Sequence, residues 1–198
     1  LKPIFAIGIP ASITNLMQSF GIMMTNRFLL PYGNEKVAAM GIVMKVNMIA
    51  VLVLVGFAFG GQPLIGYNYG ANNKKRLKDI LTFCYKFECG LAAVLAVILC
   101  VAAKPLIQIF MNQPEIVPAG VSMLRFQQLG MIFIAIVLVT TCTFQSAGKA
   151  SGAFWLSVSR QGLIFAVVIF VASKAIGYNG VITAQPVSDF LTAVLAMV

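Results

Sequence analysis

Three amide side chains recur at helical spacing in the first long apolar run of the chain. Asn15, Gln18 and Asn26 fall on one stripe of a helix. If the run crosses a membrane, such side chains either hydrogen-bond to a neighbouring helix or line a water-filled cavity. Both interpretations stay open. The second makes the stripe a candidate substrate surface, with Gln18 near the middle of the membrane.

Two charged residues stand inside later apolar runs. Lys45 lies about nine residues, or roughly 13 Å of helix, into the second run. Its ammonium group either reaches back to the membrane surface or points into the bundle or a cavity, to pair with an acid or carbonyl. Asp189 follows Pro186 in the last run and is a candidate coupling-ion site or structural ion-pair partner. Glu88 is expected at the membrane edge, which leaves Asp189 as the acid well inside a run.

The ionisable residues argue against an enzyme and against a metal site. The chain has no histidine, 14 Lys and Arg, and 5 Asp and Glu. No pair of acids and no nucleophile–base set is spaced for catalysis. The cysteines lack Cys-x-x-Cys spacing and have no histidine to complete a metal site, so no cofactor is expected. These cysteines are Cys84, Cys89, Cys100 and Cys142.

The composition identifies the surroundings of the protein. Hydrophobic residues make up 60% of the 198 residues and charged residues only 10%, whereas a soluble domain is about a quarter charged. Too few polar residues remain to cover a soluble core, so the lipid bilayer must solvate most of the surface. The net charge of +9 fits basic cytoplasmic loops better than a nucleic-acid partner, because no basic helix interleaves with aromatic residues.

Six apolar runs separated by short polar segments organise the chain. Each meets or approaches the roughly 20 residues that cross a membrane as a helix, and backbone groups in lipid must be satisfied within the segment. We therefore predict an all-α polytopic membrane protein with six transmembrane helices. The predicted spans lie near 4–30, 37–64, 84–110, 119–146, 153–176 and 180–198.

The distribution of basic residues predicts the orientation in the membrane. Seven of them fall on one side of the predicted spans, namely Lys2, Lys74, Lys75, Arg76, Lys78, Lys149 and Arg160. Four fall on the other side, namely Arg27, Lys36, Lys104 and Lys174. Basic loops stay in the cytoplasm, so the segment at 74–78 and the N-terminus are predicted to be cytoplasmic.

Several loop motifs together resemble the multidrug and toxic compound extrusion (MATE) transporters. The tract Gly60-Gly61-Gln62-Pro63-Leu64-Ile65-Gly66-Tyr67-Asn68-Tyr69-Gly70-Ala71, followed by basic residues, resembles the cytoplasmic end of the family's eighth helix. Phe144-Gln145-Ser146-Ala147-Gly148-Lys149-Ala150 is similar to the exit of its tenth helix. Ser159-Arg160-Gln161-Gly162-Leu163, Gly180-Val181 and Pro186-Val187-Ser188-Asp189 resemble its last two helices. The match covers essentially the whole chain in order.

The resemblance implies a fragment: the C-terminal six-helix lobe of a twelve-helix transporter in the bacterial inner membrane. Such transporters export amphipathic or cationic small molecules by drug:proton or drug:sodium antiport. Some members carry acids for the coupling ion in the seventh and tenth helices. This chain has Gln18 in the first region and no acid from Val121 to Phe144. The proton or sodium site is therefore expected in the absent N-terminal half, which is the lobe's main protein partner.

Two alternatives to drug export remain. A flippase for lipid-linked sugars shares the superfamily architecture, and its cavity would be expected to carry more basic residues than Lys45 and Arg125. A channel built from six-helix subunits would need a selectivity filter or a charged ring, and the sequence contains no such motif.

Overall fold

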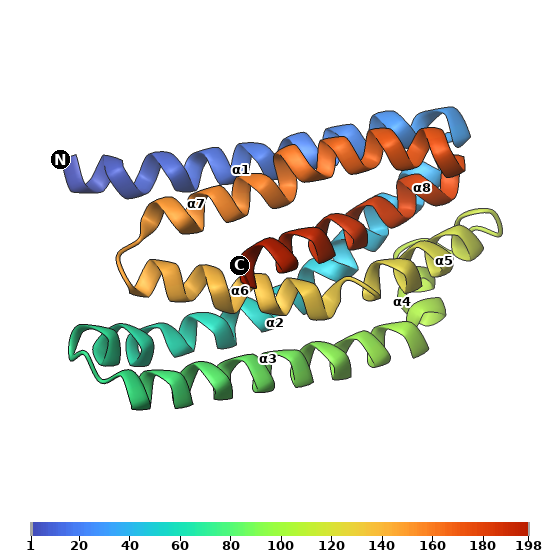
Figure 1. The fold of residues 1–198 in the computed structure, drawn as a ribbon. Helices are drawn as coiled ribbons and strands as arrows, with labels where there is room; N and C mark the ends of the chain where they lie inside the picture. Colours follow the sequence, from blue (N-terminus) through green and yellow to red (C-terminus); the bar gives the residue numbers. More distant parts are fainter. Residues whose placement is uncertain (1, 198) are drawn as a thin grey trace.

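The chain folds into helices joined by short turns (Figure 1). The computed structural model describes the backbone of residues 2–197 and the side chains of residues 12–13, 16–149 and 151–197. Its α-helices are α1 (Lys2–Leu29), α2 (Asn34–Gly70), α3 (Lys74–Val101), α4 (Ala103–Phe110), α5 (Ile116–Gln128), α6 (Met131–Ser146), α7 (Ala150–Val158) and α8 (Ile164–Met197). A 3-10 turn, η1 (Leu30–Tyr32), follows α1, and a π-helical turn, η2 (Ser159–Leu163), joins α7 to α8. The predicted all-α fold is confirmed.

The long helix α8 contains a reversal of the chain. Ile176 (φ −131°, ψ 15°) and Gly177 (φ 57°, ψ −129°) leave helical geometry, and Figure 1 shows the chain turning back there. Glycine suits this turn because it adopts positive φ without steric cost. Beyond the turn, Gly180 lies directly against the backbone carbonyl of Ala172. The predicted spans 153–176 and 180–198 are thus separated by this turn: the first consists of α7, η2 and the first limb of α8, and the second lies in the last limb of α8.

The helices pack as two layers with the last limb of α8 between them. Helix α1 lies beside α7 and the first limb of α8, while α2 packs on α3, α5 and α6 (Figure 1). Small residues bring α1 close to η2, since a methyl group at Gly21 would lie 3.4 Å from the carbonyl oxygen of Gln161. A methyl group at Gly162 would lie 3.0 Å from the sulfur of Met17. Close approach through small residues is the usual way in which helices pack in membranes.

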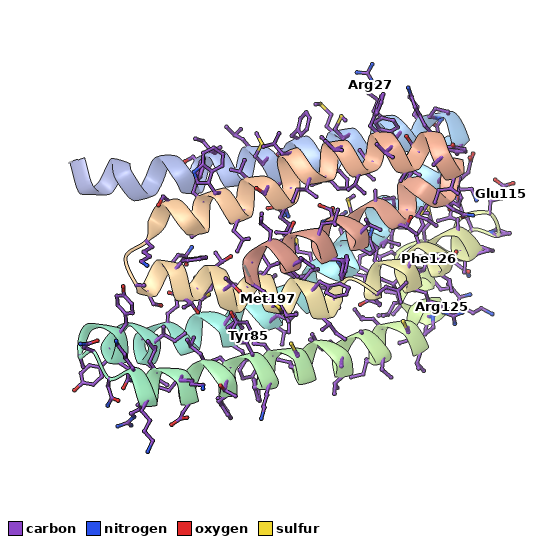
Figure 2. The ribbon with its side chains drawn as sticks, in the orientation of Figure 1. Arg27, Tyr85, Glu115, Arg125, Phe126 and Met197 are labelled. Carbon is purple, nitrogen blue, oxygen red and sulfur yellow. The ribbon has the colours of Figure 1, made fainter. Side chains whose placement is uncertain are left out.

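Polar side chains also link neighbouring helices. The amide of Gln62 in α2 donates to the Oε1 atom of Gln145 in α6 at 2.8 Å. The hydroxyl groups of Tyr85 in α3 and Thr140 in α6 are 2.8 Å apart, and Figure 2 shows Tyr85 on the α6 side of α3. The first of these bonds joins the Gly60–Ala71 tract to the Phe144–Ala150 tract, so two of the motifs recognised in the sequence meet in space.

The outer surface of the helices is apolar. Large hydrophobic side chains are more than half exposed on several helices, among them Leu16, Val97, Val101, Ile109 and Val167. Among the residues whose side chains are described, three helical stretches are long and apolar enough to cross a membrane, at residues 34–70, 74–101 and 151–197. The pair α5–α6, bent by 47°, meets the same test as one broken span. This surface fits lipid better than water.

The third helix begins ten residues before the predicted span of 84–110. Helix α3 starts at Lys74, where the side chain of Asn73 accepts a hydrogen bond from the backbone N–H of Arg76 at 3.2 Å. Its first turns are charged, and the sequence pattern therefore assigned them to a loop. The helix then ends at Val101, and α4 is a separate short helix.

Candidate functional site

The predicted polar stripe lies on α1. The side chain of Gln18 is exposed and that of Asn26 is half-buried, whereas the side chain of Asn15 is outside the described residues. Gln18 makes no hydrogen bond among the described residues. Thr25 lies seven positions later, on the same helix face, and is 5% exposed. The lobe therefore covers this face of α1 near Thr25 and leaves it open at Gln18.

Lys45 lies on the outer face of α2. Its side chain is exposed, while Val43 and Val46 beside it are 0% and 3% exposed. The side chain has no ion-pair or hydrogen-bond partner among the described residues. The possibility that Lys45 points into this bundle is therefore wrong, because the core lies on the opposite face of α2. Reaching the membrane surface and facing a cavity beside the lobe both remain compatible with its position.

Asp189 is paired inside the lobe. The Nε atom of Arg160 donates to the Oδ1 atom of Asp189 at 2.8 Å. The side chain of Asp189 is 1% exposed and that of Arg160 is 15% exposed. The amide of Gln185, one turn before Asp189 in α8, donates to the same oxygen at 3.2 Å. An acid so deep in an apolar bundle needs such partners, because an isolated buried carboxylate is very costly.

The π-helical turn η2 holds Arg160 in place. A π-turn disturbs the regular backbone hydrogen bonding of a helix and is often found at functional sites. The hydroxyl of Ser188, the residue before Asp189, donates to the backbone carbonyl oxygen of Arg160 at 2.8 Å. The limb of α8 that carries Asp189 therefore also stabilises the backbone of η2, the turn that carries Arg160.

Two further helix irregularities meet at this ion pair. Pro186 lies inside α8, and Gly130 lies in the bend between α5 and α6. A methyl group at Gly130 would lie 3.1 Å from the Cα of Pro186 and 3.2 Å from the Oδ2 atom of Asp189. The Arg160–Asp189 pair thus joins three places where helices of this lobe depart from straight α-geometry, namely η2, Pro186 and the bend at Gly130.

The placement of Arg160 corrects the charge count. It was counted among the basic residues on the cytoplasmic side, but it stands ten positions into the helical stretch that begins at Ala150 and pairs with a buried acid. Lys149, at the start of that stretch, is exposed. Without Arg160, six basic residues lie on the predicted cytoplasmic side and four on the other side, so the predicted orientation is unchanged.

Glu88, expected at the membrane edge, is also buried between the helices of the lobe. It stands 14 positions after Lys74, about 21 Å along the helix, and its side chain is 2% exposed. Because α3 starts ten residues before the predicted span, Glu88 lies near the middle of the helix and not near its start. Asp189 is therefore not alone among the acids deep in the lobe.

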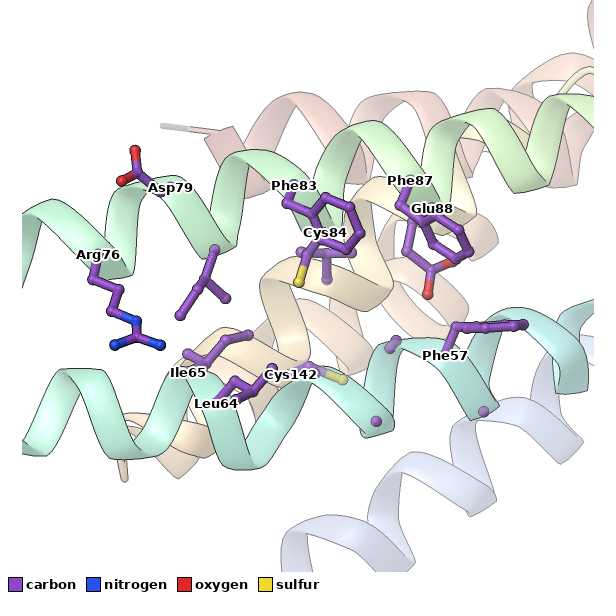
Figure 3. A pocket seen from close by; sticks show the side chains of 16 residues that line it. Phe57, Leu64, Ile65, Arg76, Asp79, Phe83, Cys84, Phe87, Glu88 and Cys142 are labelled. Carbon is purple, nitrogen blue, oxygen red and sulfur yellow. The ribbon is translucent and has the colours of Figure 1, made fainter.

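Glu88 forms part of the wall of a pocket between α2, α3 and α6 (Figure 3). The cavity has a volume of about 640 Å³, within the range of about 300–1,000 Å³ found for small-molecule sites. Its wall is mostly apolar and includes Phe57, Leu64, Phe83, Cys84, Phe87 and Cys142. Arg76 and Asp79 line the end nearest the N-terminus of α3 (Figure 3).

Comparison with known proteins identifies the family. The sequence model of the MatE family matches residues 10–177. The chain belongs to the MatE family. The family resemblance stated from the loop motifs is thereby confirmed.

MatE relatives cover this chain from end to end. It is 29% identical over 197 residues to the multidrug export protein MepA of Staphylococcus haemolyticus, an alignment that takes in 100% of this chain and 43% of the relative. The chain thus spans less than half the length of this curated relative. The relatives are transporters and not enzymes.

Solved MatE structures share the fold. A multidrug resistance MATE family transporter in an outward-facing conformation matches with a TM-score of 0.89 at 18% identity, over 98% of this chain and 44% of that protein. The MATE transporter ClbM, solved in complex with Rb⁺, matches with a TM-score of 0.89 at 21% identity, over 99% of this chain and 46% of that protein. The lobe described above is therefore a MATE-type lobe.

Sequence reasoning missed two features of the site. It counted Arg160 among the basic residues on the cytoplasmic side, although the predicted span 153–176 contains this residue. It also placed Glu88 near the start of a helix, although Asn73 is a good helix-capping residue and indicates an earlier helix start.

Proposed function

We propose that this chain is one lobe of a multidrug efflux transporter in a bacterial plasma membrane. The alignment of the whole chain with a multidrug export protein carries the proposal. The apolar outer surface and the MATE-type fold support it. In the complete protein, a second lobe faces this one across a central cavity, and a proton or sodium gradient drives export of amphipathic cations.

We further propose that the lobe crosses the membrane six times. The crossings are α1, α2, α3, the bent pair α5–α6, the stretch from α7 to the reversal in α8, and the last limb of α8. The exposed basic residues at 74–78 and the N-terminus then lie in the cytoplasm. Short α4 lies near the opposite surface of the membrane.

Efflux from intact cells tests this proposal. A susceptible bacterial strain expressing the full-length protein should accumulate less of a fluorescent cationic dye than the same strain with an empty vector. Collapsing the proton and sodium gradients with ionophores should abolish the difference. Equal accumulation in both strains, with the protein present in the membrane, would contradict the proposal.

The exposure of Gln18 predicts a substrate-dependent role. In the full-length protein, Gln18→Ala should change the apparent affinity for some exported cations by a few-fold, since a lost hydrogen bond is worth about 1 kcal/mol. Other cations should be unaffected, because a pocket for many compounds uses different contacts for each. The melting temperature in detergent should stay the same, since Gln18 bonds to no described residue of the lobe.

Gln185→Ala provides a matched control. It also removes an amide, but one that donates to Asp189, and it should lower the melting temperature and reduce export of all substrates alike. Efflux of three unrelated cations, measured beside the melting temperature, separates the two patterns. A uniform loss with a lower melting temperature for Gln18→Ala would rule out its role in binding.

A further inference from the structure

The carboxyl group of Glu88 differs from that of Asp189 in having no partner. Both side chains are almost fully buried, at 2% and 1% exposed. Asp189 accepts hydrogen bonds from Arg160 and Gln185. In the part of the chain whose side chains are described, neither carboxylate oxygen of Glu88 has a hydrogen-bond partner. The side chain of Glu88 forms part of the pocket wall (Figure 3).

The burial of a carboxyl group without a protein partner can be stabilised in only two ways. It binds a proton, or a cation enters and pairs with it, because an ionised carboxylate alone in apolar surroundings is strongly disfavoured. The nearest charged residues of the pocket wall on α3 are Asp79 and Arg76, which lie about 13 Å and about 18 Å along the helix from Glu88. The wall residues from α2 and α6 are uncharged. The positive partner of Glu88 is thus not a residue of the pocket wall.

Aromatic rings surround the same space. The ring of Phe57 in α2 lies 5.1 Å from that of Phe87 in α3, and the rings of Phe83 and Phe87 are stacked at 5.8 Å. All three residues line the pocket with Glu88. Aromatic faces attract cations, and a set of rings is the common means of binding quaternary organic cations. The wall therefore combines a carboxyl group with rings suited to an organic cation.

The pocket is open at the outer surface of the lobe. Leu64 and Phe83 line it and are 56% and 66% exposed. Gly56 and Gly60 also line it, and a methyl group at either would meet no atom within 4 Å. A ligand with an apolar body can therefore enter the pocket between α2 and α3.

We propose that this pocket binds a lipophilic organic cation, with its charge beside Glu88 and its apolar groups against Phe57, Phe83 and Phe87. The proposal rests on the proposed function, since it names a second place where the same class of substrate binds, between α2, α3 and α6. A phospholipid would place its headgroup near Arg76 and its acyl chains against Glu88, leaving the carboxyl group unpaired. A monovalent lipophilic cation satisfies the carboxyl group and the apolar wall together.

Alkylation of Cys84 reports occupancy of this pocket directly. Cys84 lines the pocket, whereas Cys100 lies elsewhere, near Arg125. The purified full-length protein in detergent is treated with N-ethylmaleimide and increasing tetraphenylphosphonium, and alkylation of each cysteine is followed by mass spectrometry. Tetraphenylphosphonium should slow alkylation of Cys84 and leave that of Cys100 unchanged. No ion gradient is present, so the result is independent of whether the protein exports anything.

Two variants distinguish the contribution of the Glu88 charge to binding from that of the free volume of the pocket. Glu88→Gln keeps the size of the side chain but removes its charge, and it should raise the half-protecting concentration of tetraphenylphosphonium at least about tenfold. Gly60→Leu fills the pocket and should abolish protection. Gly90→Leu adds the same side chain to α3 at an exposed position where a methyl group meets no atom within 4 Å, and it should protect like the wild type.

Three outcomes would overturn the proposal. One is a half-protecting concentration that is unchanged in Glu88→Gln. Another is protection of Cys84 that survives Gly60→Leu. The third is the absence of any protection of Cys84 in the wild type. A tightly bound phospholipid that is lost in Arg76→Ala would then identify the pocket as a lipid site.

Discussion

Asp189→Ala is expected to destabilise the lobe by about 3–5 kcal/mol, the usual cost of removing one partner of a buried ion pair. The change leaves the guanidinium of Arg160, 15% exposed, without its acid. It also removes the acceptor for the amide of Gln185. Three helix irregularities meet at this pair, so the loss should loosen the contact between η2 and the last limb of α8. Unfolding of the full-length protein in mixed detergent micelles measures the change in free energy.

A double variant tests whether the loss comes from the orphaned charge. Replacing both partners, as in Arg160→Met with Asp189→Leu, should recover most of the stability, because a pair of apolar residues avoids the desolvation of both charges. Glu115→Ala serves as the control, since Glu115 is an exposed acid whose side chain caps no helix. A double variant as unstable as Asp189→Ala would show that the charge of Arg160 is not the cause.

Gly180→Ala is expected to cost about 3 kcal/mol or more, at or beyond the upper end of the usual range for overpacking. The added methyl group would overlap the backbone carbonyl of Ala172 in the other limb of α8. A flexible side chain can rotate away from such a contact, but a helix backbone must shift as a whole. We expect the reversal at Ile176–Gly177 to be displaced and the yield of folded protein to fall sharply. Size-exclusion profiles and melting temperature give the measurement.

Gly90→Ala should change the stability of the protein in the opposite direction to Gly180→Ala. Gly90 is exposed on α3, and its added methyl group would meet no atom within 4 Å. Alanine inside a helix is more favourable than glycine by about 0.5–1 kcal/mol, so this variant should be slightly more stable than the wild type. Equal stability of the Gly180 and Gly90 variants would contradict the close approach of the two limbs of α8.

The turns between helices were predictable because they need particular residues. Four of the predicted polar segments each contain one residue at positive φ, namely Gly33, Asn72, Gly148 and Gly177. Glycine and asparagine adopt that conformation at little cost, and their positions in the sequence therefore mark helix ends. Hydropathy did not predict the start of α3, because the residues from Lys74 to Asp79, all charged except Leu77, are nevertheless helical. Hydropathy marks where a helix meets lipid, and α3 extends beyond that point.

The pairing of polar residues required the structure. Arg160 and Asp189 are 29 positions apart, and only the reversal at Gly177 brings them to 2.8 Å. The sequence identified Asp189 as a residue that would need a partner, but its periodicity does not fix how one helix is rotated against the next. The same limit applied to Lys45, whose outward direction depends on which face of α2 packs against α5 and α6.

Glu88 illustrates a different limit. Its burial follows from which face of α3 packs against α2 and α6. The start of α3 ten residues before the predicted span places Glu88 near the middle of the helix. The aromatic residues around it come from both α2 and α3. A contact between helices of this kind has no signature within either segment alone.

Gradient-driven transport by the purified protein tests the proposed function most directly. The full-length protein is reconstituted into liposomes, a proton or sodium gradient is imposed, and tetraphenylphosphonium is measured inside the vesicles. We expect the cation to accumulate against its concentration gradient, and an ionophore for the driving ion to abolish the accumulation. Equilibration that needs no gradient would indicate a channel, and transfer of a lipid-linked sugar without cation transport would indicate a flippase. Either result would contradict assignment of this lobe to a multidrug efflux transporter.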